Sequence, residues 1–91
     1  MQEFVGCFVK SKNGRDAGKC YVIINTHNEY VYLVDGNIRT LDNPKKKNLK
    51  HIIMLGNYDP MLYKAIKEKN VKDEEIKRAI KLLQIERQIR R

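Results

Sequence analysis

The residues best suited to chemistry lie in a polar segment near the start of the chain, residues 10–19 (KSKNGRDAGK). Its glycines would let the backbone turn tightly and approach a ligand closely. Exposed Lys and Arg side chains beside backbone N–H groups suit contact with phosphate. The same composition also fits an ordinary polar hairpin loop, and composition alone favours neither interpretation. If the segment binds a polyanion, the candidate residues are Lys10, Ser11, Lys12, Asn13, Gly14, Arg15, Gly18 and Lys19.

A second candidate site is the run of adjacent lysines at 45–47, followed by Lys50 and His51. Three neighbouring lysines are not expected to enter a core together, so this segment should face solvent or a polyanion. A solubilising loop is the alternative, and we favour phosphate contact. Arg39 is expected on the same face, and His51 is expected to be a hydrogen-bonded surface residue. The candidate phosphate-binding residues here are Arg39, Lys45, Lys46, Lys47 and Lys50.

No set of residues supports a reaction. The sequence has no nucleophile with a Ser/His/Asp context, no Walker-type loop and no zinc-ligand spacing. Gly18-Lys19 is similar to the end of a phosphate loop, but Cys20 follows in place of Ser or Thr. Cys7 and Cys20 lie in apolar runs, so two buried reduced thiols are expected in preference to a redox pair. We therefore expect no enzyme activity, no catalytic residue, no cofactor and no metal.

Short β-branched and aromatic runs between turn signals predict five strands. These strands are expected at residues 4–9, 20–24, 30–34, 37–41 and 52–55. Asn13-Gly14 predicts a turn, residues 26–29 are expected to break the second strand, and Asp35-Gly36 predicts a tight hairpin. Residues 42–50 are expected to be a polar, basic connection. Five short strands at this spacing favour a small barrel over an open sheet.

Two helices are predicted after the strands. Asp59 is expected to cap the first helix and Pro60 to occupy its first position, with the helix continuing over residues 61–69. Asn70 is expected to end this helix in the left-handed conformation. Asp73 is expected to cap the second helix, whose acidic first turn favours the helix dipole.

The second predicted helix is basic and amphipathic. Its apolar positions are Ile76, Ala79, Ile80 and Leu83, widened by Leu82, Ile85 and Ile89. Its C-terminal end carries Arg87, Arg90 and Arg91. The apolar stripe could pack within the chain, meet a protein partner or meet an anionic membrane, and we favour packing within the chain. The width of the stripe leaves a second surface or self-association open.

Charge and length narrow the class of partner. The 91 residues carry a net charge of +8, and the five basic and five acidic groups of residues 1–43 cancel, so residues 44–91 hold the whole excess. Such an excess favours a polyanion. The chain opens without a basic, apolar leader and has no apolar run of the roughly 20 residues that a membrane span requires. We therefore expect a cytoplasmic protein without a membrane partner.

Residues 5–23 (VGCFVKSKNGRDAGKCYVI) resemble a KOW motif, in which a glycine precedes a basic residue between two apolar strands, as Gly18-Lys19 does here. Residues 32–41 (YLVDGNIRTL) and 44–51 (PKKKNLKH) extend the resemblance. Over about the first two-thirds of the chain, the sequence is similar to bacterial KOW-domain proteins related to large-subunit ribosomal proteins of the L-fourteen type in archaea and eukaryotes. The resemblance implies a five-stranded SH3-like barrel and association with RNA or the ribosome.

These observations predict a mainly β protein with an α appendage. Residues 1–57 are expected to form the SH3-like KOW barrel, and residues 58–91 a basic amphipathic helical extension packed on it or projecting from it. The favoured function is non-catalytic binding of ribosomal or other structured RNA through the basic loops, with a ribosomal or other protein partner on the helical tail. The alternative is a protein-interaction adaptor in transcription or translation, because KOW domains also mediate protein contacts in elongation factors.

Overall fold

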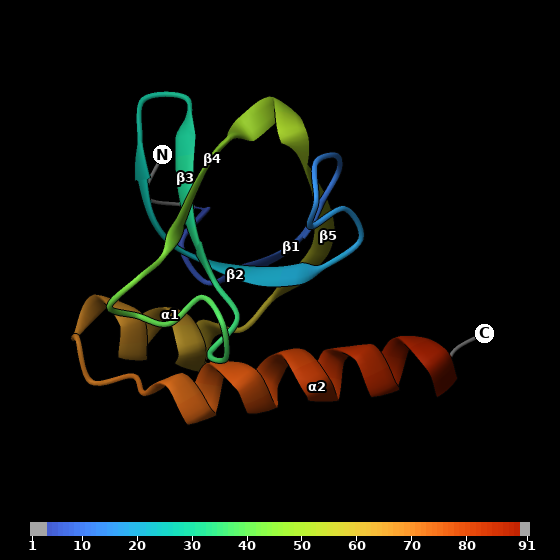
Figure 1. Ribbon diagram of the computed structural model, residues 1–91. Coiled ribbons are helices and arrows are strands. Elements are labelled where there is room, and N and C mark those ends of the chain that lie inside the picture. The colour runs from blue at the N-terminus through green and yellow to red at the C-terminus, as the bar shows by residue number, and fades with distance from the viewer. Residues whose placement is uncertain (1–3, 90–91) are drawn as a thin grey trace.

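The computed structural model describes residues 4–89, excluding the side chains of residues 57, 58, 88 and 89 (Figure 1). Five strands precede two helices. The strands are β1 (Cys7–Ser11), β2 (Cys20–His27), β3 (Tyr30–Val34), β4 (Lys45–Asn48) and β5 (Ile52–Tyr58). One turn of 3₁₀ helix, η2 (Leu49–His51), joins β4 to β5, and the helices are α1 (Pro60–Lys67) and α2 (Asp73–Ile89). The predicted order of five strands followed by two helices is confirmed.

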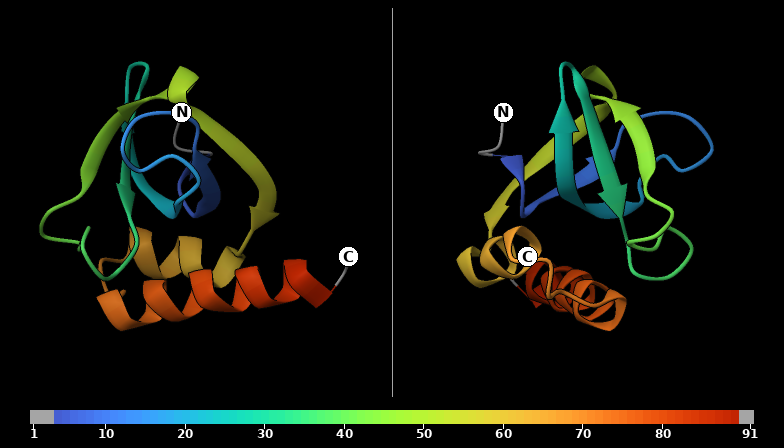
Figure 2. Two further views of the ribbon diagram at one scale, coloured as in Figure 1. Left: turned by 45° about the vertical axis from the view of Figure 1, so that its right-hand side comes forward. Right: turned by 90° about the vertical axis from the view of Figure 1, so that its left-hand side faces the viewer.

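The strands form one antiparallel sheet in the order β4-β3-β2-β1-β5. The sheet is strongly curved, and both helices lie across its outer side (Figures 1 and 2). Side chains alternate between the two sides of a strand, and each side carries an apolar cluster. The inner cluster consists of Val9, Tyr21, Ile23, Val31, Leu33 and Ile52. The outer cluster joins sheet to helices and consists of Phe8, Val22, Val34, Leu62, Ile76, Ile80 and Leu83.

The prediction of the fourth strand is wrong. Residues 37–41 form a loop, and the fourth strand is the lysine-containing segment Lys45–Asn48. The cause is Asp35, whose Oδ1 accepts hydrogen bonds from Asn37 N and Arg39 N at 2.9 Å each. In return, the backbone N–H groups of Asp35 and Gly36 donate to the carbonyl oxygen of Arg39. These bonds close a local loop, as Asp side chains often do, so the predicted tight hairpin is also wrong.

The other strands differ from prediction mainly in their ends. The third strand is confirmed at Tyr30–Val34. The first strand is shifted to Cys7–Ser11, and the second continues to His27 because the hairpin turn is confined to two residues. Asn28 adopts the left-handed conformation there, with φ of 56°, which Asn tolerates better than most residues.

The start of α1 agrees with the prediction, but the helix ends at Lys67, two residues before the predicted end at residue 69. Asp59 caps the helix, since its Oδ1 accepts from Met61 N at 3.0 Å and Leu62 N at 3.3 Å. The left-handed residue after the helix is Lys69, with φ of 59°, and not Asn70. Asn70 N donates to the carbonyl of Ala65 and Lys69 N to that of Ile66, the paired bonds of a Schellman ending.

Helix α2 buries the predicted stripe and begins differently. Asp73 is its first helical residue, and Asp73 Oδ1 accepts from Leu41 N at 2.8 Å, which ties the β3–β4 loop to the helix. Glu75 Oε1 instead accepts from the N–H of Lys72, the residue before the helix. Ile76, Ile80 and Leu83 are buried in the outer cluster, as predicted.

The C-terminal end of the predicted tail lies outside the residues that the structure describes. Arg90, Arg91 and the side chain of Ile89 lie outside the described residues. Within residues 4–89, neither helix has the length and apolar character that a membrane crossing requires.

Candidate nucleic-acid interface

A nearly buried carboxylate, that of Asp16, lies at the centre of the candidate site. Its Oδ1 accepts hydrogen bonds from Ser11 Oγ at 2.8 Å and from Lys47 Nζ at 2.9 Å. Its Oδ2 accepts from the Tyr21 hydroxyl at 3.0 Å and lies 3.8 Å from Lys45 Nζ. These partners come from β1, β2 and β4, so one side chain of the β1–β2 loop connects three strands.

The Asp16 cluster favours the ionised carboxylate. Burial by itself would raise the pKa of Asp16, but the hydrogen bonds from Lys47, Ser11 and Tyr21 and the charge of Lys47 outweigh it, so the pKa lies well below its usual range. Burial, followed by the hydrogen bond to Asp16 and its negative charge, raises the pKa of the Tyr21 hydroxyl. Asp16 therefore stays charged and Tyr21 stays a hydrogen-bond donor at neutral pH.

The lysine run is a strand in which successive side chains point to opposite sides. Lys45 pairs with Leu33 and Lys47 with Val31 across the ladder. Because cross-strand partners lie on the same side of a sheet, Lys45 and Lys47 share the inner side with those buried residues. There they meet Asp16, and the Lys47 side chain is only 11% exposed. The expectation of a solvent-facing connection is therefore wrong for these two lysines.

Lys46 is the member of the run that faces outward. It is exposed, it pairs with Tyr32 in the ladder, and its Nζ lies 4.5 Å from the centre of the Tyr30 ring. A cation over an aromatic face is attracted by the ring quadrupole. This contact holds the Lys46 ammonium beside the outer side of β3.

The β1–β2 loop has a fixed backbone. Ser11 N donates to Lys19 O and Gly18 N to Ser11 O, both at 2.9 Å. Lys47 Nζ also donates to the carbonyl of Asn13 at 2.9 Å. Gly14 and Gly18 adopt φ values of 95° and 88°, which L side chains rarely adopt. The two glycines thus permit the turns that the hydrogen bonds require.

The loop and η2 together bring several of the predicted residues to one rim. Lys12 N donates to the carbonyl of His51 at 2.8 Å, so the start of the loop lies beside η2. Arg39, on the β3–β4 loop, is half-buried and close enough to Tyr21 for its charge to oppose the raised pKa of that hydroxyl. Lys10 is half-buried on β1, and Ser11 is buried. The exposed basic residues of this rim are Lys12, Arg15, Lys19 and Lys50.

Sequence reasoning missed Asp16 and Tyr21, which organise the site without being basic. A signal for Asp16 exists in the sequence, since it is the one carboxylate among the basic residues of segment 10–19. His51 also differs from its expectation, because its Nδ1 is buried without a hydrogen-bond partner among residues 4–89.

The described residues include no arrangement typical of metal chemistry. Over residues 4–89, no three His, Cys, Asp or Glu side chains gather as metal ligands would.

Cys7 and Cys20 are free thiols and form no disulfide. Both are half-buried, whereas fully buried thiols were expected, and burial raises the pKa of Cys7.

No protein-family model matches the sequence, and no curated protein matches it.

Proposed function

We propose that this protein is a non-catalytic RNA-binding protein, associated with the ribosome or with ribosomal RNA, that contacts phosphates through the rim formed by the β1–β2 loop and η2. The observation that carries the proposal is the Asp16 cluster. It holds the loop in one conformation while Lys12, Arg15 and Lys19 remain exposed around it. A positively charged, pre-ordered loop binds a polyanion with little loss of conformational entropy.

The proposal includes a closed SH3-like barrel of the KOW type for the strand region. Three features support closure: the strong curvature of the sheet, the apolar cluster on its inner side, and the single turn η2 between the two edge strands β4 and β5 (Figure 1). The ion pair between Lys47 and Asp16 supports it further, because it links the edge strand β4 to the loop that follows β1. The resemblance of residues 5–23 to a KOW motif agrees with this arrangement.

Charge placement supports RNA as the partner. The phosphate backbone dominates the affinity of such proteins, and Lys and Arg supply the contacts. Lys46 extends the basic surface from the rim onto β4, beside the rings of Tyr30 and Tyr32. Lys45 and Lys47 contribute to the same surface indirectly, since they neutralise Asp16 and leave the loop with a net positive charge.

The experiment compares two triple variants that lose the same charge from different places. The rim variant carries Lys12→Gln, Arg15→Gln and Lys19→Gln, and the helix variant carries Lys64→Gln, Lys77→Gln and Lys81→Gln. All six side chains are exposed, so both variants should fold. Affinity for a fluorescent structured RNA is measured by anisotropy over a range of salt concentrations.

The rim variant is expected to lose up to about 100-fold in affinity at 0.1 M salt, and its log–log salt slope should become shallower by about 2 to 3, because each phosphate contact contributes about 0.7 on single strands and about 0.9 on B-form duplexes. The helix variant should stay close to wild type. Equal losses in the two variants would show that net charge alone attracts RNA, and the rim would then not be the site.

A further inference from the structure

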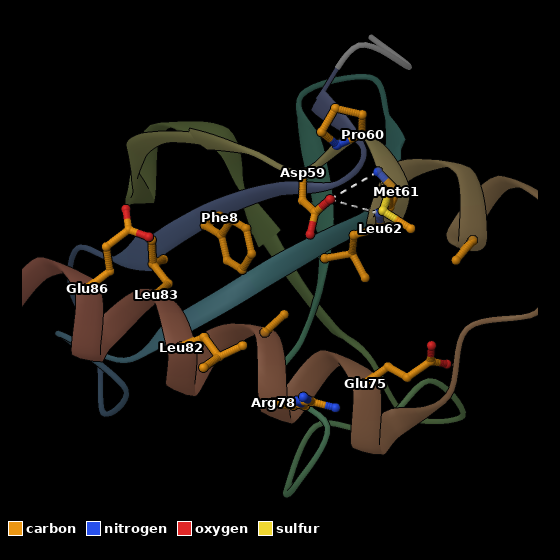
Figure 3. A pocket seen from close by; sticks show the side chains of 12 residues that line it. Phe8, Asp59, Pro60, Met61, Leu62, Glu75, Arg78, Leu82, Leu83 and Glu86 are labelled. Carbon is orange, nitrogen blue, oxygen red and sulfur yellow. Dashed lines mark hydrogen bonds between the residues drawn. The ribbon is translucent and has the colours of Figure 1, made fainter.

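A groove of about 840 Å³ separates the two helices on the outer side of the sheet (Figure 3). Phe8 of β1 and Leu62 of α1 form its apolar floor together with Leu83 of α2. Met61 and Leu82 stand at its two edges. Its volume lies within the range of ligand sites in proteins, and it is long and open rather than enclosed.

The edges of this groove expose apolar side chains that the fold does not use. Met61 is 82% exposed and Leu82 is 56% exposed, and Ile85, which lies further along α2 outside the lining of the groove, is 43% exposed. None of them belongs to either apolar cluster. Single exposed apolar residues are ordinary, but apolar side chains that flank an apolar groove are typical of an interaction site. The wide apolar stripe of α2 therefore places Leu82 beside the groove, outside the outer cluster.

The groove is also acidic, on a chain whose net charge is +8. Three carboxylates, those of Asp59, Glu75 and Glu86, line it, against one guanidinium, that of Arg78. One oxygen of Asp59 accepts from the backbone N–H groups of Met61 and Leu62, and one oxygen of Glu75 accepts from that of Lys72. Both helix starts therefore place a carboxylate in the lining of the groove.

We propose that this groove binds a basic amphipathic helix of a partner protein. Apolar side chains on one side of such a helix would fill the space above Phe8 and Leu62, as in other complexes where a helix lies in an apolar groove. Its Lys and Arg side chains would meet Asp59, Glu75 and Glu86 at the edges. The charge of the whole chain argues against a second copy as the occupant, because two molecules of +8 repel each other.

The groove and the RNA-binding rim lie on different parts of the molecule. In Figure 1, the helices lie below the strands, η2 lies at the top of the strand region, and the β1–β2 loop projects from its right-hand side. A partner helix would therefore leave the rim exposed. The groove does not depend on RNA binding, and its test needs no RNA.

The test uses the full chain and three fluorescent model helices of about 14 residues, or four turns. Each carries leucine on one side, and the opposite side carries lysine, glutamine or glutamate. The net charge of the protein by itself favours the glutamate peptide, whereas the groove favours the lysine peptide. We expect the lysine peptide to bind at least about tenfold more tightly than the glutamate peptide, a difference of about 1.4 kcal/mol.

Two matched variants place the binding site. Leu82→Lys adds a charged side chain at the edge of the groove, and Ile38→Lys makes the same kind of change on the β3–β4 loop, where Ile38 is 65% exposed. Leu82→Lys should weaken binding of the lysine peptide by about tenfold or more, because it replaces an apolar contact of the interface with a charged side chain, and Ile38→Lys should leave that binding unchanged. Tighter binding of the glutamate peptide, or equal effects of the two variants, would overturn the proposal. A dimer that Leu82→Lys dissociates in sedimentation equilibrium would also overturn it, since a second copy would then occupy the groove.

Discussion

Asp16 accepts hydrogen bonds from Ser11, Tyr21 and Lys47, which the fold brings together from three different strands. A buried charge is tolerated only when it is paired and hydrogen-bonded. The Asp16 carboxylate fulfils both conditions. The Lys47 ammonium is as little exposed and has Asp16 as its counter-charge. The candidate RNA site therefore contains two kinds of residue: exposed cations that would meet phosphate, and a buried group that positions them.

The variant Asp16→Asn tests this positioning role. It keeps the shape of the side chain but leaves the Lys47 ammonium without its counter-charge. Breaking a fully buried ion pair costs about 3–5 kcal/mol, and this cluster lies at the edge of the sheet, so we expect a loss of about 2 kcal/mol. The measurement is the free energy of unfolding by urea at pH 7.

Its control is Asp42→Asn, at an exposed position of the β3–β4 loop, which should stay within about 0.5 kcal/mol of wild type.

The stability lost by Asp16→Asn should also depend on pH. Because folding lowers the pKa of Asp16, its contribution is complete above the ordinary Asp pKa of about 4 and falls as the pH drops further. The difference in stability between wild type and Asp16→Asn should therefore begin to shrink below about pH 4 and close only as the pH approaches the lowered pKa of Asp16 in the folded protein. Equal stability at pH 7 would contradict the role assigned to the carboxylate.

At the scale of the element, local sequence signals were enough to predict a strand or helix whose formation depends on its own residues. Tyr30–Val34 is a strand by composition, and Asp59-Pro60 starts α1 through contacts within the first turn. Strand β4 could not be predicted in this way, because its three lysines lack the alternation of apolar and polar residues that indicates a strand. It forms because β3 offers an unpaired edge and because Asp16, which follows β1, receives the inward lysines.

The conformation of the β3–β4 loop was also not predictable from local residues alone. Asp35-Gly36 is a sound turn signal, but the ten-residue loop that follows β3 is also held by Asp73, which lies far along the chain and accepts from Leu41 N. Exposed Arg15, Lys12 and Lys19 were predictable from polarity and glycine content. The pairing of Lys47 with Asp16 was not, since it joins residues 31 positions apart.

The variant Gly36→Ala tests the contact of this loop with α2. Gly36 has φ of 77°, and a methyl group there would collide with the carbonyl oxygen of Asp73 and lie 2.8 Å from Lys77 N. Left-handed strain costs on the order of 1–3 kcal/mol, and the collision adds to it, so we expect a loss of about 3 kcal/mol in unfolding free energy.

Gly18→Ala is the matched control for Gly36→Ala. Gly18 has φ of 88°, but a methyl group there meets no atom within 4 Å. It should lose only the left-handed strain, about 1 kcal/mol. If both variants lose the same amount, the β3–β4 loop does not pack against α2 as described. Thermal unfolding followed by circular dichroism measures both.

At the scale of the whole molecule, charge and apolar surface are separated. The exposed cations belong to the β1–β2 loop and η2, at the side and top of the strand region in Figure 1, and the acidic apolar groove lies below the strands, between α1 and α2. Such a division lets a small protein hold a polyanion and a basic protein segment at once. Taken together, the two proposals would unite the RNA-binding and protein-interaction functions that the sequence left as alternatives.

The central claim is that an ordered rim of cations binds RNA phosphates, and the salt dependence of wild-type affinity tests it most directly. If Lys12, Arg15, Lys19, Lys46 and Lys50 each neutralise one phosphate, the logarithm of the association constant for single-stranded RNA should fall with the logarithm of salt concentration with a slope of about −3.5. Anisotropy titrations between about 0.05 and 0.3 M salt measure this slope. A slope near zero, or no binding at the lowest salt concentration, would contradict the account.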